Sequence, residues 1–239
     1  MSSRFNSDTK ADVLKCLYYE DNPSSSLLYL QIHKCFNLVD EIIVVGGYKY
    51  NDLETFISKE LKDVNSKIKC IFNEHYHDYG SGYSLLKGIQ AVSKQADEIA
   101  FIEGDLFFST GSVEAIIRSQ KDVISVNDAP IKSNKAVAFY FDAANYPHYI
   151  YDTNHSCLEI HEPFTAIYNS GQMWKFCNPN RVREICQSLT TDEEEGTNLV
   201  IIQKYFGSLS ESQMEIIRIR NWFNCNTVAD YREIYQTLK

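Results

Sequence analysis

Two carboxylates follow one apolar run in the sequence. Glu103 and Asp105 flank Gly104 directly after the apolar residues 99–102. A run of that kind predicts a buried strand, and open α/β sheets bind ligands beyond the carboxyl ends of their strands. Carboxylate oxygens are hard ligands that suit Mg²⁺ held against a phosphate-bearing substrate. The pattern alone fits a magnesium site and an acid that caps a turn equally well.

A second polar segment, residues 73–85, follows another predicted strand and leads into a predicted helix. Unpaired N–H groups at a helix start favour an anion or the polar edge of a ring, and Gly80 and Gly82 allow a close approach of the ligand. Tyr76 and Tyr79 offer rings on which a base can stack. The segment therefore has the composition of a binding loop.

Amide and basic side chains near the two ends of the chain complete the candidate set. Asn226 offers a neutral oxygen ligand, and Thr227 beside it is a suitable N-cap for the last predicted helix. Taken alone, this segment favours a helix cap with no further role. Arg4 and Lys15, taken in isolation, indicate only an exposed basic terminus.

Alternating strands and helices must position these residues. The first two-thirds of the chain predicts βαβ units, because β-branched runs alternate with amphipathic stretches. The expected helix from Asn51 has Glu54 as its capping-box partner. Strands are expected at residues 40–47, 67–73, 98–103 and 122–126, and helices at residues 24–36, from 51, 82–96 and 112–119.

The remainder of the chain predicts a smaller lobe that completes the same domain. Short strands are joined by polar turns, and two helical stretches surround an acidic run. The predicted strands are residues 137–141, 148–151, 164–169 and 215–219, and the predicted helices are residues 180–189, 197–206 and from 227. The sequence thus predicts an α/β fold, with a mostly parallel but mixed central sheet, helices on both faces and a small α+β lobe.

Composition excludes several classes of function. The 239 residues carry a net charge of −9 without a basic run, which argues against general nucleic-acid binding. No apolar stretch reaches the length of a membrane span, and residues 1–5 are not a secretory signal. Seven cysteines without a CxxC pair, and the lone pair His75 and His77, make a disulfide framework or a zinc site a poor expectation. We expect a cytoplasmic protein with reduced thiols.

Taken together and in order, these segments resemble the nucleoside-triphosphate transferase superfamily. This superfamily includes sugar-1-phosphate nucleotidyltransferases and phosphocholine cytidylyltransferases, and its sheet is like that of the A-type glycosyltransferases. The segments that carry the resemblance are residues 1–5, 14–17, 39–48, 73–85, 103–105 and 226–231. The resemblance covers essentially the whole chain as one domain, with a nucleotide-binding part (1–130), an acceptor-binding lobe (131–215) and a closing strand and helix (216–239).

The resemblance implies a magnesium-dependent nucleotidyl transfer from a nucleoside triphosphate to a sugar phosphate or an alcohol phosphate. Arg4 would grip the triphosphate, Lys15 would neutralise charge at the reacting phosphates, and Asp105 with Asn226 would hold Mg²⁺. The nucleotide-binding residues implied are Ser2, Ser3, Arg4, Asn73, Tyr76, Ser81, Gly82 and Glu103. A monomer or a small homo-oligomer is expected.

The acceptor is expected under the second lobe. An aromatic cage for choline and a polar site for the hydroxyls of a sugar both fit the composition, although most of the aromatic residues are expected in the core. The residues expected to bind the acceptor are Asn127, Asp128, Glu162, Ser170 and Gly171.

The chain departs from the family at its start. The family's first strand and its Ala-Ala-Gly loop would precede Met1, and we expect the natural protein to begin further upstream. Two other functions stay open: a related glycosyltransferase with a nucleotide-sugar donor, and a non-catalytic nucleotide-binding module. Arg4 and Lys15 favour the transferase, since a nucleotide-sugar donor does not require a grip on a triphosphate.

Overall fold

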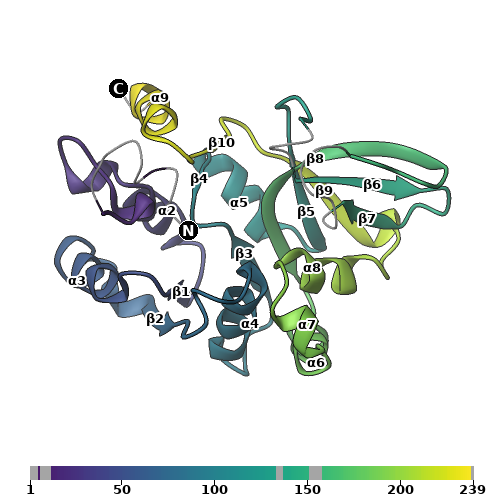
Figure 1. The fold of residues 1–239 in the computed structure, drawn as a ribbon, viewed down its shortest axis with the longest axis horizontal. Coiled ribbons are helices and arrows are strands. Elements are labelled where there is room, and N and C mark those ends of the chain that lie inside the picture. The colour runs from purple at the N-terminus through teal and green to yellow at the C-terminus, as the bar shows by residue number, and fades with distance from the viewer. Residues whose placement is uncertain (1–4, 6–11, 133–136, 151–157, 238–239) are drawn as a thin grey trace.

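The computed structural model describes residue 5 and residues 12–132, 137–150 and 158–237 (Figure 1). Strand β8 (Phe164–Phe176) is the longest element of a six-stranded sheet, and it pairs antiparallel with β3 (Ile99–Ile102), β5 (Asp122–Asn127) and β6 (Ala138–Asp142). The outer strands are β7 (Pro147–Ile150) beside β6 and β9 (Met214–Arg218), which runs parallel to β5. The sheet is mixed, and most of its strand pairs are antiparallel because β8 pairs antiparallel with three strands.

A separate parallel pair lies on the N-terminal side. Strand β1 (Ile42–Gly46) is followed by α3 (Tyr50–Glu60) and by β2 (Ile68–Phe72), which pairs with β1 in register. Among the described residues no strand pairs with both β1 and β3, so the β1–β2 pair is not hydrogen-bonded to the six-stranded sheet. The expectation of a further strand upstream of Met1 stays a prediction.

Helices cover both faces of the large sheet, so the predicted α/β architecture is confirmed. Adjacent residues of one strand enter different cores, because side chains alternate across a strand. Val123 and Met173 pack with α2 (Leu27–Cys35) and α5 (Thr110–Arg118), whereas Ile124 and Trp174 pack on the opposite face. That opposite face is covered by α4 (Ser81–Ala91), α6 (Pro179–Gln187) and α8 (Leu199–Phe206).

Short elements join these layers near the N- and C-terminal segments. The 3₁₀ turn η1 (Lys15–Leu17) packs near α2, and β4 (Leu106–Phe107) pairs antiparallel with β10 (Phe223–Asn224). Helix α9 (Val228–Thr237) closes the chain. The other short elements are η2 (Pro23–Ser25), η3 (Asn65–Lys67), α7 (Thr191–Glu194) and η4 (Glu211–Gln213). No described helix has the length and hydrophobicity that a bilayer span requires.

Several predicted boundaries are wrong for local reasons. Helix α3 begins at Tyr50, and its N-cap is Lys49 in a left-handed conformation (φ 52°), so the capping box expected at Asn51 is absent. Helix α4 ends at Ala91 instead of residue 96. The strand predicted to stop at residue 169 continues to Phe176, because a β-bulge opposite Ser125 carries the turn-like residues after 169 within the sheet.

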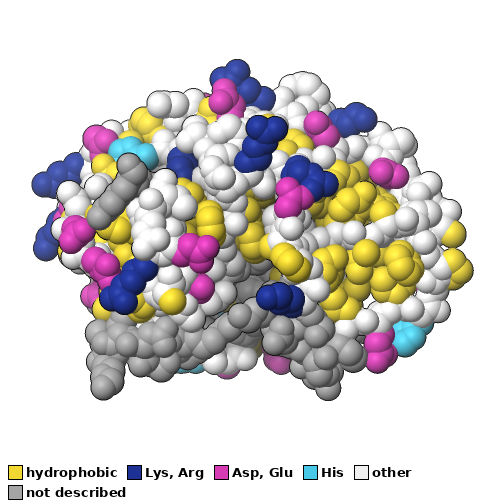
Figure 2. All heavy atoms as spheres, turned by 90° about the horizontal axis from the view of Figure 1, so that it is seen from above, with side chains coloured by type: hydrophobic (Ala, Val, Ile, Leu, Met, Phe, Trp, Pro, Cys, Tyr) yellow, Lys and Arg dark blue, Asp and Glu magenta, His cyan; other side chains and the backbone are white. Residues whose placement is uncertain are grey.

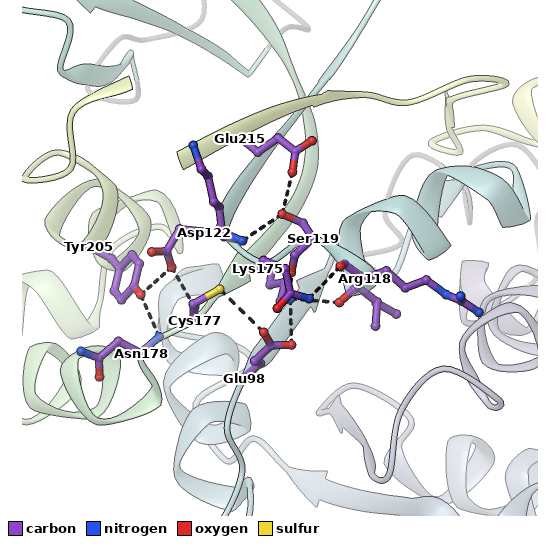
Figure 3. A network of polar contacts seen from close by, with 12 residues as sticks. Glu98, Arg118, Ser119, Asp122, Lys175, Cys177, Asn178, Tyr205 and Glu215 are labelled. Carbon is purple, nitrogen blue, oxygen red and sulfur yellow. Dashed lines mark hydrogen bonds and ion pairs between the residues drawn. The ribbon is translucent and has the colours of Figure 1, made fainter. Parts of the chain in front are cut away.

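A buried lysine ties β8 to its neighbours at the end of the sheet drawn in Figure 3. The Lys175 side chain is 2% exposed, and its ammonium donates to the carbonyl oxygens of Ile117 and Ser119. It also forms an ion pair with Glu98 Oε2 at 2.7 Å. Buried charges need partners of this kind. This network joins β8 to the end of α5 and the start of β3.

Gly171, in the bulge of β8, lies tightly against Ser125 of β5 and Ile219. A Cβ at Gly171 would lie 2.5 Å from Ile219 Cδ1 and 2.6 Å from Ser125 Oγ. We expect Gly171→Ala to lower the free energy of unfolding by about 1–3 kcal/mol, because the added methyl overpacks the sheet. Gly111→Ala is the matched control, since a Cβ there has no neighbour within 4 Å. Urea unfolding of both variants measures the difference, and equal stabilities would contradict the overpacking.

Candidate active site

Three segments distant in sequence meet at one ammonium group. Lys15 Nζ donates to Asp105 Oδ2 at 2.6 Å and to Asn226 Oδ1 at 3.3 Å. Lys15 opens η1, Asp105 lies between β3 and β4, and Asn226 follows β10. The side chains of Lys15 and Asp105 are 21% and 22% exposed. The structure therefore brings together the residues predicted to neutralise phosphate and to hold magnesium, in a partly open position.

Backbone contacts hold the two oxygen-bearing residues side by side. Strand β4 pairs with β10, and Cys225 N–H donates to the Asp105 carbonyl at 2.8 Å. The Asp230 carboxylate accepts hydrogen bonds from the N–H groups of Asn226 and Thr227, both at 2.8 Å. The Thr227 hydroxyl in turn accepts from Asp230 N–H, which confirms it as the cap of α9. The short β4–β10 ladder thus positions the ligand pair.

The Asp105–Asn226 pair fits magnesium as a partial donor set. No group of three or more His, Cys, Asp or Glu side chains suited to a metal occurs in the described part of the chain. Mg²⁺ is commonly bound through one or two protein oxygens together with phosphates and waters. The Lys15 ammonium already contacts both oxygens, so this position attracts a cation. Asp105 and Asn226 would hold the metal, with substrate phosphates as further ligands.

Glu103 lies partly buried near Asp105. Burial is the main cause that raises the pKa of its carboxyl from 4.5 to about 7, and the charge of Asp105 adds to the rise. A hydrogen bond from the Asn198 side-chain amide and the charge of Lys15 oppose it. The Gln31 amide donates to the carbonyl oxygens of Glu103 and Leu106, at 3.1 and 2.8 Å, and fixes the turn that carries Asp105.

The predicted binding loop is built around Asn73. Its side chain is buried; Nδ2 donates to Ser84 Oγ at 2.8 Å, and Oδ1 accepts from His75 N–H at 2.8 Å. Tyr76 packs directly on Gly47, where a Cβ would lie 2.2 Å from the Tyr76 Cβ. The Asn73 amide groups shape the loop, and base recognition by Asn73 and Tyr76 stays a prediction.

The start of α4 is clamped by residues 195–198. Gly80 N–H donates to the Glu195 carbonyl at 2.8 Å and Gly82 N–H to the Gly196 carbonyl at 3.1 Å. Ser81 Oγ accepts from Asn198 N–H at 3.1 Å. Gly82 and Ser81, both expected to read the base, therefore already have partners inside the protein, and their role toward a base stays a prediction.

Asn198 and Gln31 are the residues that sequence reasoning missed. Asn198 is 4% exposed and connects Ser81 at the start of α4 with Glu103 after β3. It occupies the N-cap position of α8, but its side chain makes no cap hydrogen bond. Its position after Gly196 and Thr197 carries no signal of a contact with residue 103. Only the packing of α8 beside α4 creates that contact.

Most residues predicted to bind the acceptor lie inside the sheet. The Asn127 amide donates to the Ser170 carbonyl at 2.7 Å, and both residues are buried. Gly171 packs tightly against Ser125. Asp128 is exposed and pairs with Arg218. Asn127, Ser170 and Gly171 therefore make structural contacts within the sheet, and their contact with an acceptor stays a prediction.

Glu162 lies on a different surface, that of the β6–β8 lobe. It accepts a hydrogen bond from the Tyr140 hydroxyl at 2.6 Å, and the Tyr140 ring contacts Phe164, which is 49% exposed. Figure 2 shows hydrophobic side chains gathered on the right-hand half of the face it presents. Ser2, Ser3 and Arg4, the predicted phosphate loop, lie outside the described residues.

The fold is that of the nucleotidyltransferases. The inositol-1-phosphate CTP transferase from T. maritima superposes with a TM-score of 0.69 at 16% identity, covering 98% of this chain and 91% of that one. The CTP:phosphocholine cytidylyltransferase from Streptococcus pneumoniae gives 0.64 at 14% identity, covering 100% and 95%. A UDP-glucose pyrophosphorylase gives 0.71 at 11% identity, covering 99% and 94%. The resemblance inferred from the sequence is confirmed at the level of the fold.

By sequence, the chain belongs to the DUF6564 family, a domain of unknown function that matches residues 11–238. No curated protein matches the sequence.

The raised pKa of Glu103 predicts a specific pH dependence of stability. Between pH 4.5 and 7 the unfolded chain loses the Glu103 proton while the folded chain keeps it. The contribution of Glu103 to the free energy of unfolding is fully present below pH 4.5 and is lost as pH rises through 7. Between pH 4.5 and 7.5, the free energy of unfolding of Glu103→Gln should therefore rise by about 3 kcal/mol relative to that of the wild type.

Urea unfolding at the two pH values measures this gain, with the exposed Glu60→Gln as control. A stability difference between Glu103→Gln and wild type that does not change with pH would contradict the assignment.

Loss of the Asn198 amide should leave the partly buried Glu103 carboxyl short of a hydrogen-bond donor. We expect Asn198→Ala to lower the free energy of unfolding at pH 8 by about 1–3 kcal/mol. Asn180→Ala removes an exposed amide that accepts a hydrogen bond from Arg183, and its effect should stay below about 0.5 kcal/mol. Equal losses in the two variants, measured by chemical denaturation, would show that the Asn198 contact adds nothing.

Proposed function

We propose that this protein transfers a nucleotidyl group from a nucleoside triphosphate to a phosphorylated small molecule and releases pyrophosphate. The observation that carries the proposal is the convergence of Lys15, Asp105 and Asn226 beside β3 and β10 of a nucleotidyltransferase fold. A basic residue and two oxygen ligands at one point are what the transfer of a nucleotidyl group between phosphates requires.

In the proposed reaction, a phosphate oxygen of the acceptor attacks the α-phosphorus in line, and the bond to pyrophosphate breaks. Positioning and charge stabilisation supply most of the catalysis, since the protein forms no covalent bond to the substrate. Bound magnesium would withdraw negative charge from the phosphate oxygens. Lys15 would neutralise the charge that develops on the reacting phosphates, and Asp105 with Asn226 would hold the metal beside it.

We propose the class of acceptor from the names of the similar solved structures. The names of two similar proteins specify inositol-1-phosphate and phosphocholine, and a third specifies UDP-glucose. A sugar phosphate or an alcohol phosphate is therefore the acceptor class that we propose. In the β6–β8 lobe, the rings of Tyr140 and Phe164 lie beside the Glu162 carboxylate. Aromatic rings and a carboxylate are the groups that bind a quaternary ammonium, so we propose this surface for such an acceptor.

We propose a cytoplasmic location and a monomer or small homo-oligomer for the active protein. The six cysteines within the described residues are all free thiols, which suits a reducing compartment.

A pyrophosphate-release assay tests the proposal. Full-length protein, including any in-frame upstream sequence, is incubated with Mg²⁺, each of the four nucleoside triphosphates, and sugar-1-phosphates, inositol-1-phosphate or phosphocholine. We expect acceptor-dependent release with one triphosphate. Asp105→Asn should reduce the rate about a hundredfold or more, because it removes the charged metal ligand. Asp97→Asn, an exposed acid just before the opposite end of β3, should keep the wild-type rate.

The assay also separates the alternatives. Triphosphate binding without release for any acceptor would overturn the transferase in favour of a binding module. Hydrolysis or transfer from a nucleotide-sugar donor, with no use of triphosphates, would instead support the related glycosyltransferase.

A further inference from the structure

The predicted magnesium ligands share one internal cation. The ammonium of Lys15 lies 2.6 Å from Asp105 Oδ2 and 3.3 Å from Asn226 Oδ1. These are the two oxygens that the proposed function assigns to the metal. One positive group cannot contact both at these distances without occupying the region where a divalent ion bound to both oxygens would lie. Lysine and metal are therefore alternatives at this pair of oxygens.

The surroundings favour a positive charge at this position. A second carboxyl group, that of Glu103, lies in the same turn as Asp105. Cys225, which precedes Asn226, is buried, and Cys16, which follows Lys15, is partly buried. With only about a fifth of each side chain exposed, the Lys15–Asp105 attraction is screened less than that of a surface pair. Without Lys15, the same oxygens would face a local excess of negative charge.

The backbone around Lys15 is held while its side chain can change direction. Cys16 and Leu17 pack against a hydrophobic core formed with α2 and α3, and Leu17 N–H donates to the Leu14 carbonyl at 2.9 Å. A lysine carries its charge on a flexible four-carbon stem. The ammonium can thus exchange the Asp105 oxygen for a phosphate oxygen without a rearrangement of η1.

We propose that Lys15 is an intrinsic counter-ion of the metal site. It competes with a free divalent cation for Asp105 and Asn226, and it yields when a triphosphate brings the metal and offers its own oxygens to the ammonium. The proposal rests on the nucleotide and metal chemistry of the proposed function, and it adds an order of binding. The metal enters together with the triphosphate, and the nucleotide-free protein binds metal poorly.

Manganese binding to the nucleotide-free, full-length protein tests this competition directly. Free Mn²⁺ is quantified by electron paramagnetic resonance during titration of the wild type and of Lys15→Met, which keeps an unbranched stem without the charge. We expect Lys15→Met to bind one Mn²⁺ about tenfold more tightly or better, because the competing charge is gone. The double variant Lys15→Met/Asp105→Asn should lose that gain, which assigns the site.

Two further variants control for charge and for folding. Lys15→Arg keeps the positive charge and should bind Mn²⁺ as weakly as the wild type. Lys87→Met removes a lysine that pairs with Glu74, away from Asp105, and should not change Mn²⁺ affinity. If Lys15→Met fails to fold in thermal unfolding, Lys15→Gln provides the same comparison.

The proposal is overturned if removal of the Lys15 charge leaves Mn²⁺ affinity unchanged, or if the gain persists without the Asp105 carboxylate. The measurement uses no nucleotide and no acceptor. A missing pyrophosphate release would therefore count against the proposed function alone, and an unchanged Mn²⁺ affinity against the counter-ion alone.

Discussion

The pairing of β8 with three other strands is the constraint on which the rest of the molecule depends. Its C-terminal half, around Trp174, pairs with β3 and β5, and its N-terminal half, around Tyr168, pairs with β6. The strand that ends at the Glu103–Asp105 turn and the lobe that carries Tyr140 are therefore parts of one hydrogen-bonded sheet. A register shift in β8 would move every side chain to the opposite face and displace both regions. The buried Lys175 at the far end of the same strand fixes its position against α5 and β3.

Around the site, carboxyl groups outnumber the cations that contact them. Glu103 is partly buried with a raised pKa, Asp105 faces Lys15, and Asp230 supports the backbone of Asn226. Such a cluster is stable only when a cation or a hydrogen-bond donor is provided to each group. Here the donors come from Asn198 and Lys15. The same excess of carboxyl groups that is costly for stability would, in the proposed function, attract the metal that accompanies a triphosphate.

The comparison with solved nucleotidyltransferases concerns the fold, and at 11–16% identity it leaves the chemistry to this chain's own residues. The clamp of residues 195–198 on Gly80 and Gly82 illustrates the difference. The sequence predicts that those N–H groups are available to a ligand, but in the folded chain they donate to backbone carbonyls. Any base must be bound by other groups, or this clamp must shift when it binds.

The sequence by itself determined the alternation of strands and helices, because apolar periodicity is a local property of the chain. It also determined that Asp105 follows a buried strand and that Thr227 caps the last helix, since both signals span only a few residues. Local patterns could not determine how far β8 extends, because Asn169, Ser170 and Gly171 are typical of a turn, whereas a β-bulge retains them within the sheet.

Only the tertiary structure decided which polar groups meet. Lys15 contacts Asp105 across 90 positions and Asn226 across 211, and Asn198 reaches Glu103 across 95. No short-range pattern encodes such contacts, since they depend on strand order and helix packing. The same applies to Asn127 and Ser170, whose polarity suggested a ligand but whose hydrogen bond lies within the sheet. Residue type indicated what chemistry was available, and the packing of distant segments decided where it was assembled.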